Sequence, residues 1–183
     1  MSYVAPSHPK QSTVDLIPLM KEVFPCHLPS SQIAFVCIGT DRATGDCLGP
    51  LVGTFLKEKG YPHVYGTLDS PVHFKNIQQI VSSIPKGKTV IAIDCTLGKT
   101  SEVGDIRLFK GSVSAGAITQ KQGIVVGDYG LLGVVNIGGY MEPFMLQCTP
   151  LNLVMNMAKT IAETISKAIV TNRSSLTQRR SVS

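Results

Sequence analysis

Two short runs made almost wholly of apolar residues set the strongest limit on the fold. Residues 33–36 (IAFV) and 90–93 (VIAI) carry no polar side chain. Such a run indicates a strand buried on both faces, as in a parallel sheet covered by helices. Residues 48–58 and 73–84, which lie between these runs, have apolar residues at helical spacing. The order strand, helix, strand, helix, strand therefore predicts an α/β layered fold with a largely parallel sheet.

The remaining segments extend this pattern without suggesting a second fold. A helix is expected over residues 13–24, and a short strand over residues 63–68. After residue 98 the sequence becomes a series of strand-like runs broken by glycine and serine, which predicts an antiparallel extension or hairpin. Thr149-Pro150 introduces a long apolar-periodic helix that is expected to end near residue 170. We predict three parts: an N-terminal extension with one helix (1–31), an α/β domain (32–170) and a basic flexible tail (171–183).

Composition and charge argue against a membrane or a nucleic acid as the partner of this protein. The chain has 183 residues, 43% of them hydrophobic, which suits one domain with an ample core. No apolar run reaches the roughly 18 residues of a membrane helix. Of the net charge of +5, three positive charges are arginines of residues 171–183, and aromatic residues make up only 6%. Neither a membrane nor a nucleic-acid partner is expected.

Cysteine usage indicates a reducing compartment. The five cysteines form no C-x-x-C pair and no zinc-like spacing, and several lie within apolar runs. Reduced thiols of this kind are typical of cytoplasmic proteins. The first 30 residues also lack the charged start and apolar stretch of a signal peptide. A soluble, cytoplasmic protein is the expectation.

The stretch CIGTDRATGDCLGP, residues 37–50, joins the first predicted strand to the first predicted helix. Its glycines, at 39, 45 and 49, match neither a dinucleotide fingerprint nor a phosphate-binding loop. Its acids, Asp41 and Asp46, would repel a phosphate. A phosphate site is therefore rejected.

Asp94 ends the second apolar run, so it is expected at the same sheet edge as Asp46. Two unit charges about 4 Å apart repel by about 4 kcal/mol at an effective dielectric constant of 20. Such a pair either shares one proton, and can then activate water, or binds a cation. Asp46, near a helix start, would then stay ionised and Asp94 would hold the proton. The alternative is that each aspartate caps a helix or turn, and the residues alone favour a cap for Asp46.

Other reactive side chains near these acids admit simpler explanations. Cys47 and Cys95 each follow an acid directly, so in extended backbone they would face the core rather than the acid. A Cys–His dyad that uses His73 is the weaker alternative. Asp128 and Tyr129 lie between glycines and are more typical of an ordinary turn.

TGDCLGP (44–50) together with VIAIDCT (90–96) resembles the two aspartate motifs of the spore germination protease family. Residues 32–170 resemble a sporulation protein family related to it, and more distantly the hydrogenase maturation endopeptidases. The resemblance implies a three-layer α/β/α sandwich of the phosphorylase/hydrolase-like type with a mixed, mostly parallel sheet. In the germination protease an aspartate pair cleaves small acid-soluble spore proteins. The resemblance implies that Asp46 and Asp94 occupy the positions of that catalytic pair. Hydrogenase maturation enzymes instead hold nickel with help from a later histidine, and this chain has no histidine after His73.

We therefore expect an aspartate-dependent, sporulation-associated peptidase of the forespore or spore core. It would act on a protein or peptide, with small acid-soluble spore proteins as candidates, would need no resident cofactor, and would form a homodimer. One alternative is a non-catalytic sporulation factor that binds a protein partner on the same fold. A second alternative is a hydrolase with a divalent metal at Asp46 and Asp94. The loop residues expected to bind substrate or an oxyanion are Gly39, Thr40, Asp41, Gly45, Cys47, Cys95 and Thr96.

Overall fold

A five-stranded sheet of order β2-β1-β3-β7-β4 forms the centre of the computed structural model. The structure describes residues 16–116 and 123–180, with side chains as far as residue 169. Neighbouring strands from β2 to β7 are parallel, and β4 at the edge is antiparallel to β7. The strands are β1 (Ile33–Cys37), β2 (Val64–Tyr65), β3 (Thr89–Gly98), β4 (Ile106–Lys110) and β7 (Tyr129–Ile137).

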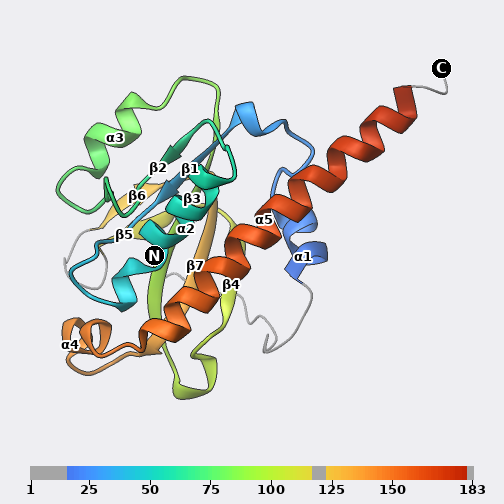
Figure 1. Cartoon of the computed structure of the whole chain (residues 1–183). Coiled ribbons are helices and arrows are strands. Elements are labelled where there is room, and N and C mark those ends of the chain that lie inside the picture. The colour runs from blue at the N-terminus through green and yellow to red at the C-terminus, as the bar shows by residue number, and fades with distance from the viewer. Residues whose placement is uncertain (1–15, 117–122, 181–183) are drawn as a thin grey trace.

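Helices lie on both sides of this sheet (Figure 1). One side is covered by α1 (Leu16–Val23), α2 (Leu48–Glu58) and α5 (Leu151–Arg180). The other side carries α3 (Ile77–Ser83) and a separate hairpin of β5 (Val113–Ala115) and β6 (Ile124–Val126). The short helix α4 (Glu142–Gln147) precedes α5. The predicted three-layer architecture with a mixed, mostly parallel sheet is confirmed.

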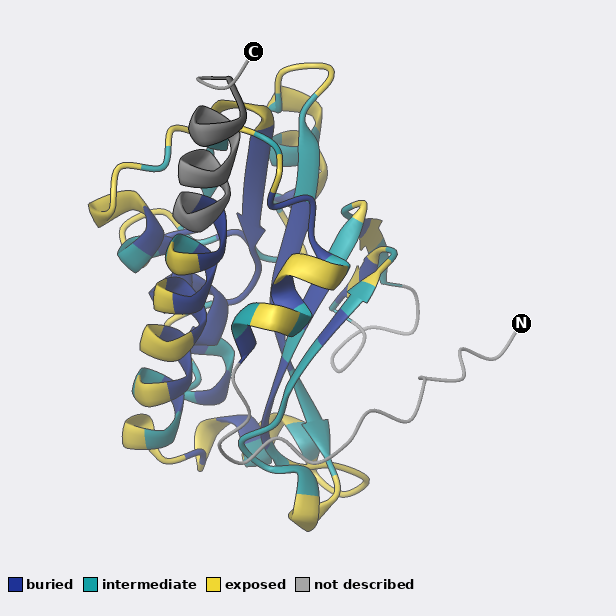
Figure 2. Ribbon diagram, turned by 90° about the vertical axis from the view of Figure 1, so that its right-hand side faces the viewer, coloured by how far each residue is buried: buried dark blue, intermediate teal, exposed yellow. Residues whose placement is uncertain are grey.

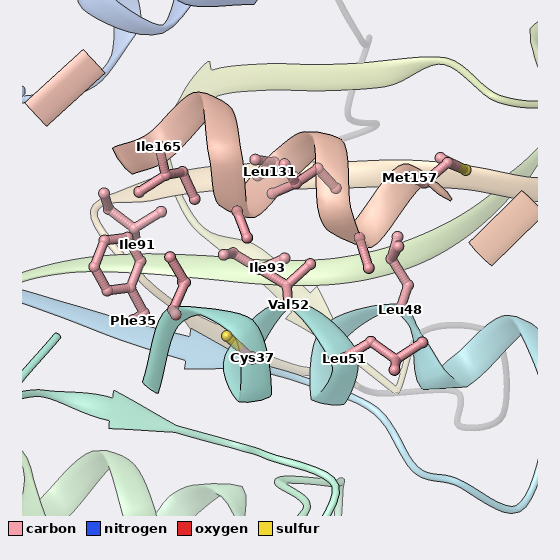
Figure 3. Close-up of a cluster of buried hydrophobic side chains, with 14 of the residues drawn as sticks. Phe35, Cys37, Leu48, Leu51, Val52, Ile91, Ile93, Leu131, Met157 and Ile165 are labelled. Atoms are coloured by element: carbon pink, nitrogen blue, oxygen red, sulfur yellow. The ribbon is translucent and has the colours of Figure 1, made fainter. Parts of the chain in front are cut away.

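Each side of the sheet has its own hydrophobic core. The larger core joins α1, α2 and α5 to the sheet, and Figure 3 shows side chains such as Val52, Ile93 and Ile165 meeting there. The smaller core joins α3 and the hairpin to the opposite side through residues such as Ile77 and Val113. All five residues of β1 are buried, as a strand covered on both faces requires. In Figure 2 the inner strands are accordingly dark blue, whereas the outer side of α5 is exposed.

Several predicted boundaries differ from the structure. The helix expected over 73–84 begins only at Ile77, and residues 74–76 before it form a turn in which the Asn76 side chain bonds back to residues 71–73. The strand expected over 63–68 is limited to Val64–Tyr65, since Gly66 has a φ of 92°. The expected end of the last helix near residue 170 is wrong. The backbone stays helical to Arg180, and no glycine or proline interrupts that stretch.

The start of the helix predicted at residues 13–15 lies outside the described residues. Within the described part of the chain, no helix has both the length and the apolar content needed to cross a membrane. The division into extension, domain and tail stays a prediction.

Glycines bring α2 unusually close to the strands. A methyl group on Gly49 would lie 2.0 Å from the Ile38 carbonyl oxygen, and one on Gly53 would lie 1.9 Å from the Gly66 carbonyl oxygen. Neither space can hold a side chain without moving the backbone. The start of α2, and the turn that carries Asp46 immediately before it, are thereby held against the sheet.

Replacing Gly53 by alanine should lower stability, although alanine is the better helix former by about 1 kcal/mol. The methyl group would push α2 off the strands, and overpacking of this kind costs about 1–3 kcal/mol. Chemical denaturation should therefore give a lower free energy of unfolding for Gly53→Ala. The exposed Glu58→Ala on the same helix should change it by no more than about 0.5 kcal/mol. An unchanged or higher stability for Gly53→Ala would contradict the close packing.

Candidate active site

Asp46 and Asp94 come from two neighbouring segments at the carboxyl edge of the sheet. Asp94 belongs to β3, and Asp46 to a single 3-10 turn, Gly45–Cys47, that leads into α2. In the register of β1 and β3, Cys37 pairs with Ile93, so Asp94 is the first β3 residue beyond the end of β1. The loop that leaves β1 folds over this position. The topology thus brings the two acids together.

The site is a compact cluster of two carboxylates and one thiol. One oxygen of Asp46, one oxygen of Asp94 and the Cys95 sulfur all lie within 4.8 Å of one another. The Cys95 thiol donates a hydrogen bond to Asp46 Oδ1 at 3.5 Å. Asp94 Oδ1 accepts a bond from the Cys95 backbone N–H at 2.8 Å.

Helix capping does not account for Asp46. The residue at the N-cap position of α2 is Cys47, and the one before the 3-10 turn is Thr44; neither makes a side-chain capping bond. The Asp46 carboxylate instead points to Cys95. The capping hypothesis for Asp46 is therefore wrong.

The two cysteines beside the acids behave differently. Cys47 is buried in the larger core, as its position next to an acid predicted. Cys95 is also buried and packs with that core, yet its thiol reaches Asp46. The expectation that it would face away from the acids failed because the loop that leaves β1 carries Asp46 past the end of β1 to this part of β3. From there it meets Asp94 on one side of β3 and Cys95 on the other.

Burial governs the protonation of the pair. Burial first, and then the charge of Asp46, raise the pKa of Asp94 well above its usual range, against the opposing bond from the Cys95 N–H. Burial also raises the pKa of Asp46, but the Cys95 thiol, the Thr40 backbone and the charge of His73 oppose that rise. The environment therefore favours the proton on Asp94 and the negative charge on Asp46.

The same surroundings keep the Cys95 thiol protonated. Burial and the charges of Asp94 and Asp46 raise the pKa of Cys95 well above that of a free thiol. A nucleophilic cysteine needs the opposite environment, because the thiolate is the reactive form. The geometry thus assigns Cys95 a hydrogen-bond donor's role and disfavours a Cys–His dyad.

The cluster opens into a cleft of about 990 Å³. Its apolar lining residues include Leu68, Phe74, Phe109 and Val113. Most of the residues proposed for substrate or oxyanion binding line this cleft: Gly39, Thr40, Asp41, Cys95 and Thr96.

Two residues proposed for this role lie elsewhere. Gly45 is buried, and its α-carbon faces Thr149, Leu146 and Val135, while Cys47 belongs to the core. Two backbone N–H groups considered for an oxyanion are already bonded. That of Gly39 donates to Val72 at 2.8 Å, and that of Thr40 donates to the Asp46 carbonyl at 3.1 Å. These two groups are therefore not free to stabilise a developing negative charge.

The sequence suggested His73 only as part of the weaker Cys–His alternative, and the structure places it in the cleft. A usable signal existed, since His73 lies in the loop that follows β2 and such loops gather at the carboxyl edge of a parallel sheet. The aromatic lining could not be predicted from the sequence, because Phe74 and Phe109 are far apart in the chain and line the same cleft only in the folded structure.

Asp46, Asp94 and Cys95 also form the kind of set that can hold one divalent cation. Oxygen and sulfur ligands in this number suit a borderline ion such as zinc. The metal-dependent alternative therefore has a defined location.

Comparison with known proteins agrees with this architecture. The crystal structure of the [NiFe] hydrogenase maturation protease HycI from Thermococcus kodakarensis KOD1 superposes with a TM-score of 0.55, covering 82% of this chain and 98% of that one. At 19% identity this likeness shows the fold. YyaC of Bacillus subtilis (strain 168), described as an uncharacterized protein, is 47% identical over 153 residues, which are 81% of this chain and 73% of YyaC.

The family model described as "Protein of unknown function (DUF1256)" matches residues 7–164. That span includes Asp46, Asp94 and the central sheet. The chain therefore belongs to the DUF1256 family.

Proposed function

We propose that this protein is a peptidase-like hydrolase whose Asp46 and Asp94 carboxyl groups together activate a water molecule. The observation that carries the proposal is the convergence of the two carboxyl groups at an open cleft, in surroundings that raise the pKa of both. Acids with pKa values pushed upward and apart are typical of paired acid–base catalysis. The fold shared with a maturation protease supports hydrolysis of a protein substrate.

The two acids have distinct roles in this mechanism. Ionised Asp46 takes a proton from water as the water oxygen bonds to the peptide carbonyl carbon. Protonated Asp94 donates a hydrogen bond to the carbonyl oxygen, which gains negative charge in the transition state. Asp94 thus stabilises the negative charge on the carbonyl oxygen. The N–H groups of Gly39 and Thr40 do not, because they already donate to backbone carbonyl groups. Cys95 steadies the Asp46 carboxylate through its thiol.

The proposed substrate is a polypeptide in an extended or unfolded form. The cleft is large enough for several residues, and its apolar walls suit hydrophobic side chains. The resemblance of the two aspartate motifs supports small acid-soluble spore proteins as substrates, and the forespore or spore core as the place of action. A homodimer stays a prediction.

Removing either carboxyl group should abolish hydrolysis while leaving the fold intact. Asp46→Asn cannot accept the proton from water, and Asp94→Asn is a weaker donor to the carbonyl oxygen. Each should lower kcat for cleavage of small acid-soluble spore proteins by at least about 100-fold. Glu58→Gln, an exposed change on α2, should retain full activity.

The same assay separates the alternatives. If Asp46→Asn cleaves as fast as the natural protein, the paired-acid mechanism is wrong. Loss of activity in a chelator, with recovery on adding a divalent metal, would favour the metal-dependent hydrolase. A natural protein that binds spore proteins without cleaving them would favour the non-catalytic factor.

The buried acid should also cost stability near neutral pH. The pKa of Asp94 is higher in the folded protein than in the unfolded chain. As pH rises above about 3.9, this carboxyl group therefore loses its proton in the unfolded chain but keeps it in the folded protein, and the free energy of unfolding falls. Asp94→Asn removes this cost and should raise Tm at pH 7, by about 2–4 °C for each kcal/mol regained. The gain should shrink when both proteins are compared nearer pH 4.5. Thermal unfolding that shows the same or a lower Tm for Asp94→Asn at pH 7 would contradict the assignment of Asp94 as the protonated acid.

Thiol labelling tests the assignment of Cys95 as a neutral donor. Of the five cysteines, Cys148 is exposed and the other four are buried. Iodoacetamide at neutral pH should therefore modify Cys148 in the native protein and all of them in denaturant. Native Cys148→Ser should stay unlabelled. Rapid alkylation of Cys95 in the native protein, seen by mass spectrometry, would instead support a reactive thiolate.

A further inference from the structure

We propose that His73 is the general acid that protonates the leaving amine in the hydrolysis proposed above. The inference rests on that proposed function, in which the aspartates serve the water and the carbonyl oxygen. A peptide nitrogen also needs a proton before the C–N bond can break. Asp46 that has been protonated by water is one source of it, and we infer that His73 is the donor instead. His73 lines the same cleft as both acids and is half-buried there.

The loop that carries His73 is tied to the loop that carries Asp46. Ile38 and Val72 form a parallel bridge, and the Gly39 N–H donates to the Val72 carbonyl at 2.8 Å. His73 is the next residue after Val72. His73 therefore follows directly on backbone that is paired with the start of the Asp46 loop, and in that loop the Thr40 N–H donates to the Asp46 carbonyl at 3.1 Å.

Asn76 holds the His73 loop in its turned shape. It occupies the N-cap position of α3, yet its side chain makes no capping bond to that helix. Its Oδ1 accepts from the His73 backbone N–H at 2.8 Å, and its Nδ2 donates to the Pro71 carbonyl at 3.0 Å. Asn76 thus stabilises residues 71–73, which lead into the helix. It acts as a positioning residue for His73.

The electrostatic influence of His73 on Asp46 agrees with their place in one cleft. Positive charge on His73 lowers the pKa of Asp46, so the two side chains influence each other across the cleft. The other cations lining the cleft suit proton donation less well. Arginine does not release its proton in proteins, which removes Arg42 and Arg107, and Arg107 is also paired with Glu102 at 3.0 Å. Lys75 is exposed, and a lysine ammonium holds its proton more tightly than an imidazolium.

The proposed step balances protons and bonds. Water adds to the carbonyl carbon and gives one proton to Asp46. The imidazolium of His73 gives its proton to the peptide nitrogen as the C–N bond breaks, which releases a neutral amine and leaves a neutral imidazole. The proton on Asp46 then returns to the imidazole through solvent, and the site is restored. No oxidant, metal or further reactant takes part.

A pair of substrates with different leaving groups tests this role. His73→Gln should lower kcat for a peptide amide by about 100-fold or more, because an amine cannot leave without a proton. For the p-nitrophenyl ester of the same peptide acid, whose leaving group needs no proton, kcat should change by less than about threefold on the same reasoning. The exposed His27→Gln is the matched control and should cleave both substrates normally. His73→Asn provides a second variant, and circular dichroism checks the fold of each.

Asn76→Ala tests the positioning claim. It should lower the amide rate in the same direction as His73→Gln, with the ester rate unchanged. Equal losses on amide and ester in His73→Gln would overturn the inference, since they would indicate a role in binding or in stabilising the oxyanion. No loss on either substrate would overturn it as well.

Failure of this inference can be told apart from failure of the proposed function. If Asp46→Asn loses both activities while His73→Gln keeps both, only the role of His73 is wrong. If Asp46→Asn keeps both activities, the paired-acid mechanism itself is wrong.

Discussion

The contact between α2 and the strands beneath it is the constraint on which the site depends. Two glycines of the helix, Gly49 and Gly53, let its backbone pack directly against two carbonyl groups. These belong to Ile38 and Gly66, which follow β1 and β2. The turn before the helix is consequently pressed against β3, where Asp94 emerges just beyond the end of β1. A helix held a side chain's width further out would carry Asp46 away from its partner. Close packing in the core therefore determines the distance between the two acids.

That distance, combined with burial, sets the chemistry that the site can perform. Bringing a second carboxylate to a buried first one is unfavourable unless one of them keeps a proton. The surroundings favour the charge on one of the two acids, since the ionised form of Asp46 is stabilised by the Cys95 thiol, by the Thr40 backbone and by the charge of His73. Asp94 has only the Cys95 N–H to oppose its burial and the charge of Asp46. The resulting division into a base and an acid is a property of the environment, because the two side chains are chemically identical.

The sequence predicted the parts of this arrangement that depend on regular secondary structure. Apolar runs located the central strands, and the helix expected at residues 48–58 coincides with α2. The convergence of Asp46 and Asp94 followed from the rule that parallel strands end at one edge. What escaped prediction depends on loop paths. The thiol of Cys95 meets Asp46 because of the path taken by the loop that leaves β1, and the Asn76 side chain bonds back to the His73 loop before α3 begins. Neither event leaves a periodic signal in the sequence.

In the proposed mechanism the acid pair holds one proton near neutral pH, with Asp94 as its principal carrier. A ¹³C NMR titration of the protein labelled at its aspartate carboxyl carbons measures this proton. We expect one carboxyl signal that titrates far above the ordinary aspartate range and disappears in Asp94→Asn, while the Asp46 signal then moves to a lower pKa. Ordinary acidic titration of both carboxyl groups would rule the mechanism out, because two independent carboxylates could not act as a base and an acid at neutral pH.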